Sequence, residues 1–159
     1  MKKLKAKLTV IGKLHEDFAE QWVGHYIKLL DRYCELEIKF LKEEKLMEGK
    51  NEAEVLRRES ERIIEEVKTG DFLVILDKTG KRFKSEDFAK FVEAYYQRSD
   101  VNLHFVIGGA IGVSEQILKF ADMKLSMSDM TLPHQLAVVV FVEQLYRAVS
   151  LIQGLPYHK

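Results

Sequence analysis

The sequence predicts an α/β fold in which a mainly parallel sheet is flanked by helices. Three observations carry this prediction. Apolar and polar residues alternate over residues 4–10, as in a half-buried strand, and apolar residues at helical spacing follow over residues 15–31. Residues 72–76 form a continuous apolar run, typical of a strand buried on both faces. Strand and helix patterns then keep alternating, which favours parallel strands joined by helical crossovers.

The elements of the first half follow in order. A second strand is expected over residues 36–40, where apolar and charged residues alternate, and the charged stretch 42–50 is expected to be a loop. Asn51, with Glu54 three residues later, has the spacing of a capping box. We expect it to open a helix that ends at Gly70.

The elements of the second half continue the alternation. After the strand at 72–76, residues 77–81 are expected to form a turn, and Ser85 is expected to cap a helix that reaches Tyr96. A strand is expected over residues 101–107, followed by a short helix from Ser114 and a brief strand over residues 125–127. A loop over residues 128–133 and a long helix over residues 134–153 complete the chain.

Composition restricts the class of protein. The length of 159 residues and the hydrophobic content of 47% fit one compact domain over residues 1–159. Basic and acidic side chains number 25 each, so overall charge gives no sign of a polyanionic ligand. No apolar run approaches the roughly 18–20 residues of a membrane span, so we expect no membrane partner. The single cysteine, Cys34, cannot form an internal disulfide, which favours a reducing, cytoplasmic location.

Several kinds of catalytic site are disfavoured by spacing. The five histidines show no zinc-ligand pattern and only one cysteine is present, so we expect no metal. No G-x-S-x-G motif supports a serine nucleophile. The sequence lacks a P-loop motif, and its glycines do not fit the G-x-G-x-x-G dinucleotide pattern.

A glycine cluster directly follows the strand at 101–107. Ligands of open α/β sheets bind outside the carboxyl ends of the strands, where Gly108, Gly109 and Gly112 are expected to lie. Glycine also permits close approach of a ligand to the backbone. A turn needed only to reverse the chain explains the same glycines equally well.

The long helix at 134–153 indicates a partner. Residues 136–142 are apolar on every side of the helix, so every side must be covered. One sheet face covers one side only, and we expect a second copy of the chain to cover the rest as a homodimer. Glu143, Gln144 and Arg147 interrupt this apolar surface, paired with one another or directed at a site.

Four separated motifs resemble one family. Residues 105–112, 125–136, 143–148 and 156–159, together with residues 10–14 near the start, are similar to the RlmH family of bacterial SPOUT-class methyltransferases. The resemblance covers essentially the whole chain. It implies methylation of N3 of a pseudouridine in large-subunit (23S) ribosomal RNA, with S-adenosylmethionine as cofactor and the ribosome as the setting. It also implies a homodimer and a C-terminal trefoil knot, which binds the cofactor over about residues 72–159.

The resemblance also assigns roles to residues. It implies cofactor contacts along three segments, with apolar walls for the adenine from Leu76, Met130 and Leu132. Candidates to place or deprotonate the target base are His134, Tyr157 and His158, and Arg147 is a candidate to hold RNA phosphate. The full set of implied cofactor positions is Leu76, Gly108, Gly109, Met127, Ser128, Asp129, Met130, Thr131, Leu132 and Pro133.

Two departures keep alternatives open. Ala137-Val138 stands where family members often carry an arginine, and Asp129 stands where they often have lysine or alanine. RNA affinity rests largely on neutralising phosphates, so both changes and the neutral net charge weaken it. The alternatives are a SPOUT methyltransferase for a different RNA nucleotide, a non-catalytic ribosome- or RNA-binding protein of the same fold, and an unrelated α/β nucleotide-binding module.

Overall fold

The computed structural model describes residues 2–47, 49 and 51–159, and within them an all-parallel five-stranded sheet. The strand order is β2-β1-β4-β3-β5. This confirms the predicted α/β class with a parallel sheet. The strands are β1 (Leu4–Ile11), β2 (Cys34–Leu41), β3 (Asp71–Arg82), β4 (Asn102–Ile107) and β5 (Met123–Ser126).

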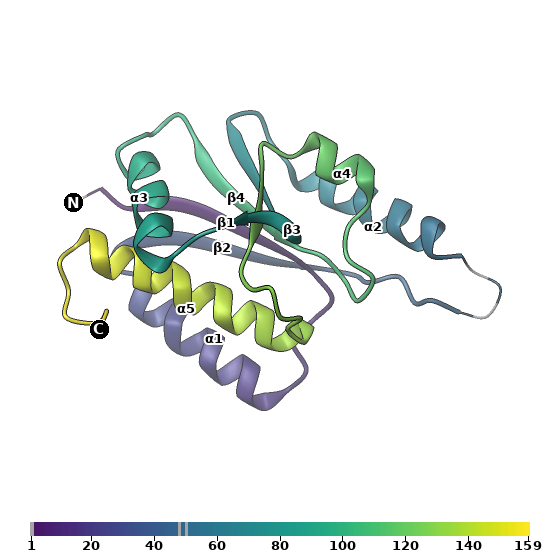
Figure 1. The fold of residues 1–159 in the computed structure, drawn as a ribbon, viewed down its shortest axis with the longest axis horizontal. Helices are drawn as coiled ribbons and strands as arrows, with labels where there is room; N and C mark the ends of the chain where they lie inside the picture. The colour runs from purple at the N-terminus through teal and green to yellow at the C-terminus, as the bar shows by residue number, and fades with distance from the viewer. Residues whose placement is uncertain (1, 48, 50) are drawn as a thin grey trace.

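Helices cover both faces of the sheet (Figure 1). On one face α5 (His134–Ile152) lies between α1 (Asp17–Leu30) and α3 (Ser85–Tyr96). On the other face α2 (Glu52–Glu66) contacts α4 (Glu115–Phe120). Right-handed crossovers explain this division, because connections that run in opposite directions along the sheet place their helices on opposite faces.

Alternate side chains of the pleated strands pack into two separate cores, one on each face of the sheet. Leu8 and Phe105 point into the larger core beneath α1, α3 and α5, where Phe105 lies 4.7 Å, centroid to centroid, from Phe141 of α5. Ile75 and Val106 point the opposite way, into the smaller core beneath α2 and α4. Successive strand residues therefore face different layers, as the period of two in the sequence requires.

The structure confirms the predicted cap at Asn51 and the predicted helix start at Ser114, but not the predicted cap at Ser85. The side chain of Asn51 accepts a hydrogen bond from the Glu54 N–H at 2.8 Å, and Ser114 caps α4 by accepting from the Ile117 N–H at 3.2 Å. The predicted cap at Ser85 is wrong, because the N-cap residue of α3 is Lys84. The Ser85 hydroxyl donates instead to Oε1 of Gln144 on α5, at 2.9 Å.

The turn predicted at 77–81 is also wrong, because β3 continues to Arg82. Leu76 and Lys81 both pair with Leu125 of β5, so the four residues between them leave the ladder as a bulge. At Gly80 a Cβ would lie 2.5 Å from the Lys124 carbonyl carbon, so only glycine fits this close approach to β5.

The long apolar helix α5 is a core helix. Val138, Phe141 and Leu145 are fully buried between the sheet and the neighbouring helices. By length and composition alone α5 is long and apolar enough to cross a membrane, although half of its most apolar 18-residue stretch is buried inside the protein. Leu136 stays 37% exposed near its N-terminus. The trefoil knot implied for residues 72–159 stays a prediction.

A buried polar network crosses three neighbouring strands at the heart of the sheet. The Thr9 hydroxyl lies 2.7 Å from Nε2 of His104, whose Nδ1 lies 2.9 Å from a carboxylate oxygen of Asp71. His104 is fully buried. Burial lowers the pKa of its imidazole, and the neighbouring Asp71 only partly offsets this effect.

Acid should therefore destabilise the protein through His104. A histidine whose pKa is lower in the folded state than its ordinary value of about 6.5 binds fewer protons when folded. Its stabilising contribution is complete above that value and is lost as the pH falls toward the folded-state pKa. We expect the free energy of unfolding, measured in urea, to fall between pH 7.5 and 5.5 and to fall less in His104→Gln. Equal pH dependence in the two proteins would contradict this.

Candidate functional site

The register of three adjacent strands brings the predicted cofactor segments together. Leu76 on β3 pairs with Ile107 on β4 and with Leu125 on β5. Gly108 directly follows Ile107, and the loop that begins at Met127 follows β5. Three segments that lie far apart in the sequence therefore meet at one edge of the sheet, at the carboxyl ends of its strands.

This edge also contains the topological switch of the sheet. The chain leaves β1 toward β2 and leaves β4 toward β5, so two adjacent strands send their connections in opposite directions. Ligands of open α/β sheets bind in the crevice that such a divergence opens. Gly12 follows β1 and Gly108 follows β4, so both lie at the crevice.

The glycines of the 108–112 turn have a structural reason of their own. A Cβ on Gly108 would lie 2.8 Å from the carbonyl oxygen of Gly112 and 2.7 Å from the Val113 side chain. Gly112 has a φ of 83°, in the left-handed region that favours glycine. The turn therefore closes tightly on itself and presents backbone at the sheet edge.

The loop from Met127 to Pro133 is held at its start and open at its middle. Ser126 donates to the Ser128 carbonyl at 3.2 Å, and the Ser128 hydroxyl accepts from the Met130 N–H at 2.9 Å. The Met130 side chain is 80% exposed. An exposed apolar side chain on this loop fits the predicted role of an adenine wall.

Asp129 is paired within the same loop region. Its carboxylate accepts from Arg82, near the end of the bulged strand β3, at 2.6 Å. Both side chains are largely exposed, so this pair adds little to stability. It does neutralise the acid that departs from the family pattern.

A cavity of about 190 Å³ opens beside this loop. Met127 and Ser126 line it from the end of β5, and Gln144 lines it from α5. Aromatic side chains, among them Phe83 and Phe88, form much of its wall. The cavity therefore joins the predicted cofactor loop to the polar residues in the middle of α5.

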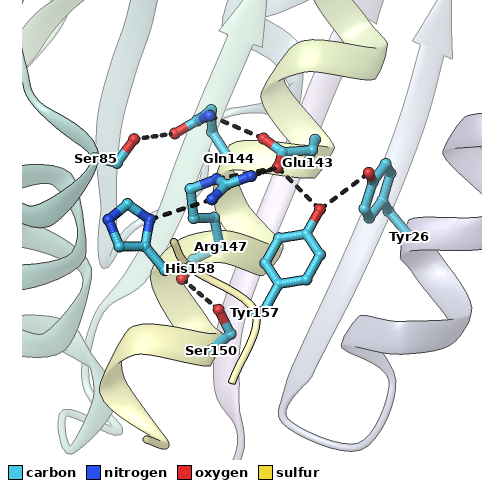
Figure 2. Close-up of polar contacts among 8 residues, drawn as sticks. All are labelled: Tyr26, Ser85, Glu143, Gln144, Arg147, Ser150, Tyr157 and His158. Carbon is cyan, nitrogen blue, oxygen red and sulfur yellow. Dashed lines mark hydrogen bonds and ion pairs between the residues drawn. The ribbon is translucent and has the colours of Figure 1, made fainter. Parts of the chain in front are cut away.

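Those polar residues continue into the C-terminal tail (Figure 2). Nε2 of Gln144 donates to Glu143 at 2.8 Å, and Arg147 donates to the other oxygen of Glu143 through two nitrogens, at 2.6 and 3.0 Å. The Tyr157 hydroxyl donates to that same oxygen at 3.0 Å and lies 3.1 Å from the Tyr26 hydroxyl. We call Tyr26, Glu143, Gln144, Arg147, Tyr157 and His158 the tail cluster.

Hydrogen bonds fix the proton on His158. Nδ1 lies 3.1 Å from Nη1 of Arg147, and a guanidinium can only donate. Nδ1 therefore accepts, and Nε2 carries the proton that it donates to Glu86 at 3.0 Å. Both ring nitrogens of His158 are thus occupied within the chain.

Tyr157 is held in its protonated form. Burial raises the pKa of its hydroxyl, and the hydrogen bonds to Tyr26 and Glu143 raise it further. The guanidinium of Arg147 lies over its ring, 4.8 Å from the centroid. At neutral pH Tyr157 can donate a hydrogen bond but cannot serve as a base.

His134 lies away from the other two candidates for base chemistry. It begins α5, and the nine residues from it to Glu143 span about 13 Å of helix. Its Nε2 is buried with no hydrogen-bond partner among the described residues, and a Cβ on Gly12 would lie 3.5 Å from it. One chain therefore brings Arg147, Tyr157 and His158 together but not His134.

Sequence reasoning missed several members of this region. Tyr26 joins the tail cluster from α1, and Glu86 of α3 contacts the cluster through His158. No motif singled out either residue. Glu59 lies buried against the glycine turn and also carried no signal. Across residues 2–47, 49 and 51–159, no group of three or more His, Cys, Asp or Glu side chains is arranged to hold a metal.

Comparison with known proteins places the chain in a family. A family model described as "Predicted SPOUT methyltransferase" matches residues 4–158. The protein named Ribosomal RNA large subunit methyltransferase H of Acetivibrio thermocellus is 37% identical, over 98% of this chain and 100% of its own length. The protein of the same name from Lactococcus lactis subsp. cremoris is 42% identical with the same coverage.

A solved structure matches the fold. A probable methylase family protein from Haemophilus influenzae aligns with a TM-score of 0.56 over 98% of this chain and 71% of its own. The two sequences are only 14% identical, so this likeness supports the fold alone.

The hydrogen bonds of the tail cluster predict how the pKa of Tyr157 depends on the charge of Glu143. Replacing Glu143 by Gln removes the negative charge that Tyr157 faces, so the pKa of the Tyr157 hydroxyl should fall toward its ordinary value of about 10. Titration of ¹³C-labelled tyrosine by NMR, assigned with Tyr157→Phe, measures this. Glu86→Gln is the matched control, because Glu86 contacts His158 and should leave Tyr157 unchanged. An unaltered titration in Glu143→Gln would contradict the hydrogen bond.

Proposed function

This chain belongs to the SPOUT methyltransferase family, and from that premise we propose that it methylates large-subunit ribosomal RNA as the Ribosomal RNA large subunit methyltransferase H proteins are named to do. The methyl donor in this proposal is S-adenosylmethionine, and the acceptor is N3 of a pseudouridine. The substrate is RNA presented in an assembled ribosomal particle. The protein works in the cytoplasm, which suits its single, buried thiol: burial raises the pKa of Cys34 to about 12.

One observation carries this proposal. The strand register aligns Leu76, Ile107 and Leu125, which sets the predicted cofactor segments side by side at the carboxyl edge of the sheet. The cavity beside Met127 then connects that edge to the tail cluster through Gln144. The segments proposed to bind the cofactor thus lie next to a group of polar side chains suited to a base, which supports the proposal.

The residues at the edge fit an adenosyl cofactor. The turn at Gly108 and Gly109 offers backbone, and Leu76, Met130 and Leu132 offer apolar surface for the adenine. The remaining residues of the loop, up to Pro133, wrap the cofactor in this proposal, within a knotted unit over about residues 72–159. When bound, S-adenosylmethionine would supply a methyl group on a sulfonium, which an aligned nitrogen can attack in line while the neutral thioether leaves.

In this proposal the tail cluster binds the acceptor base and takes its proton. N3 must lose its proton before or during transfer, which leaves negative charge on the base. The Arg147 guanidinium stabilises that charge, and the Tyr157 hydroxyl, which its raised pKa keeps protonated, turns its one proton from Glu143 to a base oxygen. His158, whose Nδ1 accepts from Arg147, takes the proton once the base draws the guanidinium away. His134 is the second candidate for this role, with its unpartnered Nε2.

Two features of this site reduce its attraction for RNA phosphate. Ala137-Val138, of which Val138 is fully buried, stands where family members often carry an arginine, and Asp129 neutralises Arg82. With 25 basic and 25 acidic side chains, the whole chain carries no net charge to attract free RNA. A ribosomal particle supplies shape and protein surfaces in addition to phosphate, which supports an assembled substrate. The same buried valine also favours a second candidate function, a non-catalytic ribosome-binding protein.

A homodimer completes the proposal. Helices α1 and α5 lie side by side (Figure 1), and Trp22 of α1 is 51% exposed while Leu136 of α5 is 37% exposed. Phe18, one turn before Trp22, is also exposed. Large apolar side chains on two adjacent helices need a cover, and a second copy presents a self-complementary one.

Two measurements test the proposed function. Calorimetric titration with S-adenosylmethionine, with ATP and dinucleotides as controls, should show selective binding of the methyl donor. Incubation with intact ribosomes, isolated subunits and free RNA, followed by mass spectrometry of the nucleosides, should show methylpseudouridine on the particles. Binding without methylation of any nucleoside would favour the non-catalytic function. Methylation of another nucleotide would favour a different specificity.

Removal of the tail should separate binding from catalysis. Deleting residues 157–159 removes Tyr157 and His158 and leaves the glycine turn and the 127–133 loop intact. We expect unchanged affinity for S-adenosylmethionine and a loss of about 100-fold or more in the methylation rate. Replacement of Lys159 alone by Ala is the control, and full activity of the deletion variant would exclude a role for the tail.

Charge placed on the exposed apolar surface should prevent dimerisation. Because Trp22 and Leu136 are exposed in the single chain, Trp22→Glu and Leu136→Glu should fold but associate at least about tenfold more weakly. Sedimentation velocity measures the association. Phe120→Glu is the matched control, because Phe120 is 53% exposed on α4, on the opposite face of the sheet. A dimer that tolerates both changes must use another surface.

A further inference from the structure

A buried carboxyl lies directly against the glycine turn. Glu59, on the inner side of α2, is only 4% exposed. A Cβ on Gly109 would lie 3.0 and 3.2 Å from the two carboxyl oxygens of Glu59, closer than ordinary contact. The φ of Gly109 is not positive, so its backbone would accept another residue. The space beside Gly109 is therefore taken by Glu59 together with Ile11, whose Cγ2 would lie 3.1 Å from the same Cβ.

The two oxygens of Glu59 have different surroundings. Oε2 accepts a hydrogen bond from the Glu44 N–H at 3.0 Å, which ties α2 to the segment after β2. Oε1 is buried and has no hydrogen-bond partner within the described parts of the chain. Burial raises the pKa of this carboxyl. A buried acceptor without a donor is costly, and packing alone would be served better by an apolar side chain.

The next residue of α2 holds the other end of the same turn. The Ser60 hydroxyl lies 2.5 Å from the Ser114 hydroxyl, and Ser114 caps α4 directly after the turn. Ser60 is fully buried. Two successive residues of one helix therefore brace the segment from Gly109 to Ser114 at both ends.

We propose that Glu59 is a positioning residue of the cofactor site, whose buried carboxyl sets where the Gly109 backbone lies for the bound nucleoside. The inference rests on the proposed function, which places the cofactor on Gly108 and Gly109. Glu59 acts from the α2 face, beneath the turn, and reaches the cofactor through the backbone of Gly109. Glu59 contributes the volume of its side chain and a hydrogen-bond acceptor oxygen, and different substitutions can test the two contributions separately.

A size-compensation experiment tests this inference. Gly109→Ala adds a methyl group against the carboxyl and should weaken S-adenosylmethionine binding roughly tenfold, which corresponds to about 1.4 kcal/mol. Glu59→Ala removes the support and should weaken binding by a similar factor. In the double variant the added methyl group no longer meets the carboxyl and faces only Ile11, so affinity should recover to within about threefold of wild type. Glu59→Gln keeps both the shape and an acceptor and should bind almost as wild type does.

Two controls separate positioning from general stability. Ile63→Val destabilises the same helix from within the smaller core and should lower the melting temperature without changing affinity. Glu61→Ala removes an exposed acid that pairs with Arg57 and should change neither quantity. Calorimetry gives the affinity, and thermal unfolding without ligand gives the stability of each variant.

The outcomes are distinct. Affinity that drops in Glu59→Ala, recovers in Glu59→Gln and in the double variant, and is unaffected by Ile63→Val supports the inference. Wild-type affinity in Glu59→Ala, or no recovery in the double variant, would overturn it and leave the proposed function standing. No binding by the wild-type protein would overturn the proposed cofactor, even if the melting temperatures still showed coupling between Glu59 and Gly109.

Discussion

The candidate site depends on the register of β3 between its two neighbours. Leu76 is aligned with Ile107 on one side and with Leu125 on the other, and each of these residues stands at or next to the end of a strand segment. A slip of one residue would reverse the faces of β3 and separate the glycine turn from the 127–133 loop. Ile75 and Val74 resist such a slip because each is fully buried in a different core.

Helix α5 extends the site from that edge into the interior of the molecule. It starts directly after the 127–133 loop and runs beneath the sheet, so Gln144 reaches the cavity that Met127 also lines. Three turns of apolar contacts, including Phe141 against Phe105, fix the rotation of the helix. The polar residues at 143, 144 and 147 then share the face that meets the C-terminal tail.

Patterns within single segments were predictable, whereas contacts between segments were not. The alternation of β1, the apolar run in β3 and the Asn51 cap each depend on neighbouring residues, so the sequence shows them. The bulge after Leu76 depends on the close approach of Gly80 to β5, which no local pattern contains. The Ser85 cap failed for the same reason, because its hydroxyl found a partner on α5, fifty-nine residues away. Glu86, Glu59 and Tyr26 reach the site through contacts between distant segments, which no local pattern contains.

The hydrogen bonds of Arg147 bear on its two proposed roles, which are to hold RNA phosphate and to stabilise charge on the target base. Its guanidinium already donates to Glu143 through two nitrogens and to His158 through a third contact, inside a partly buried cluster. An RNA phosphate would have to enter beside the Glu143 carboxylate, and like charges at that distance repel. A base that is neutral on arrival meets no such repulsion, and its charge develops only when its proton leaves. In the proposed mechanism Arg147 therefore acts on the base, and the RNA-phosphate contact expected of it stays a prediction.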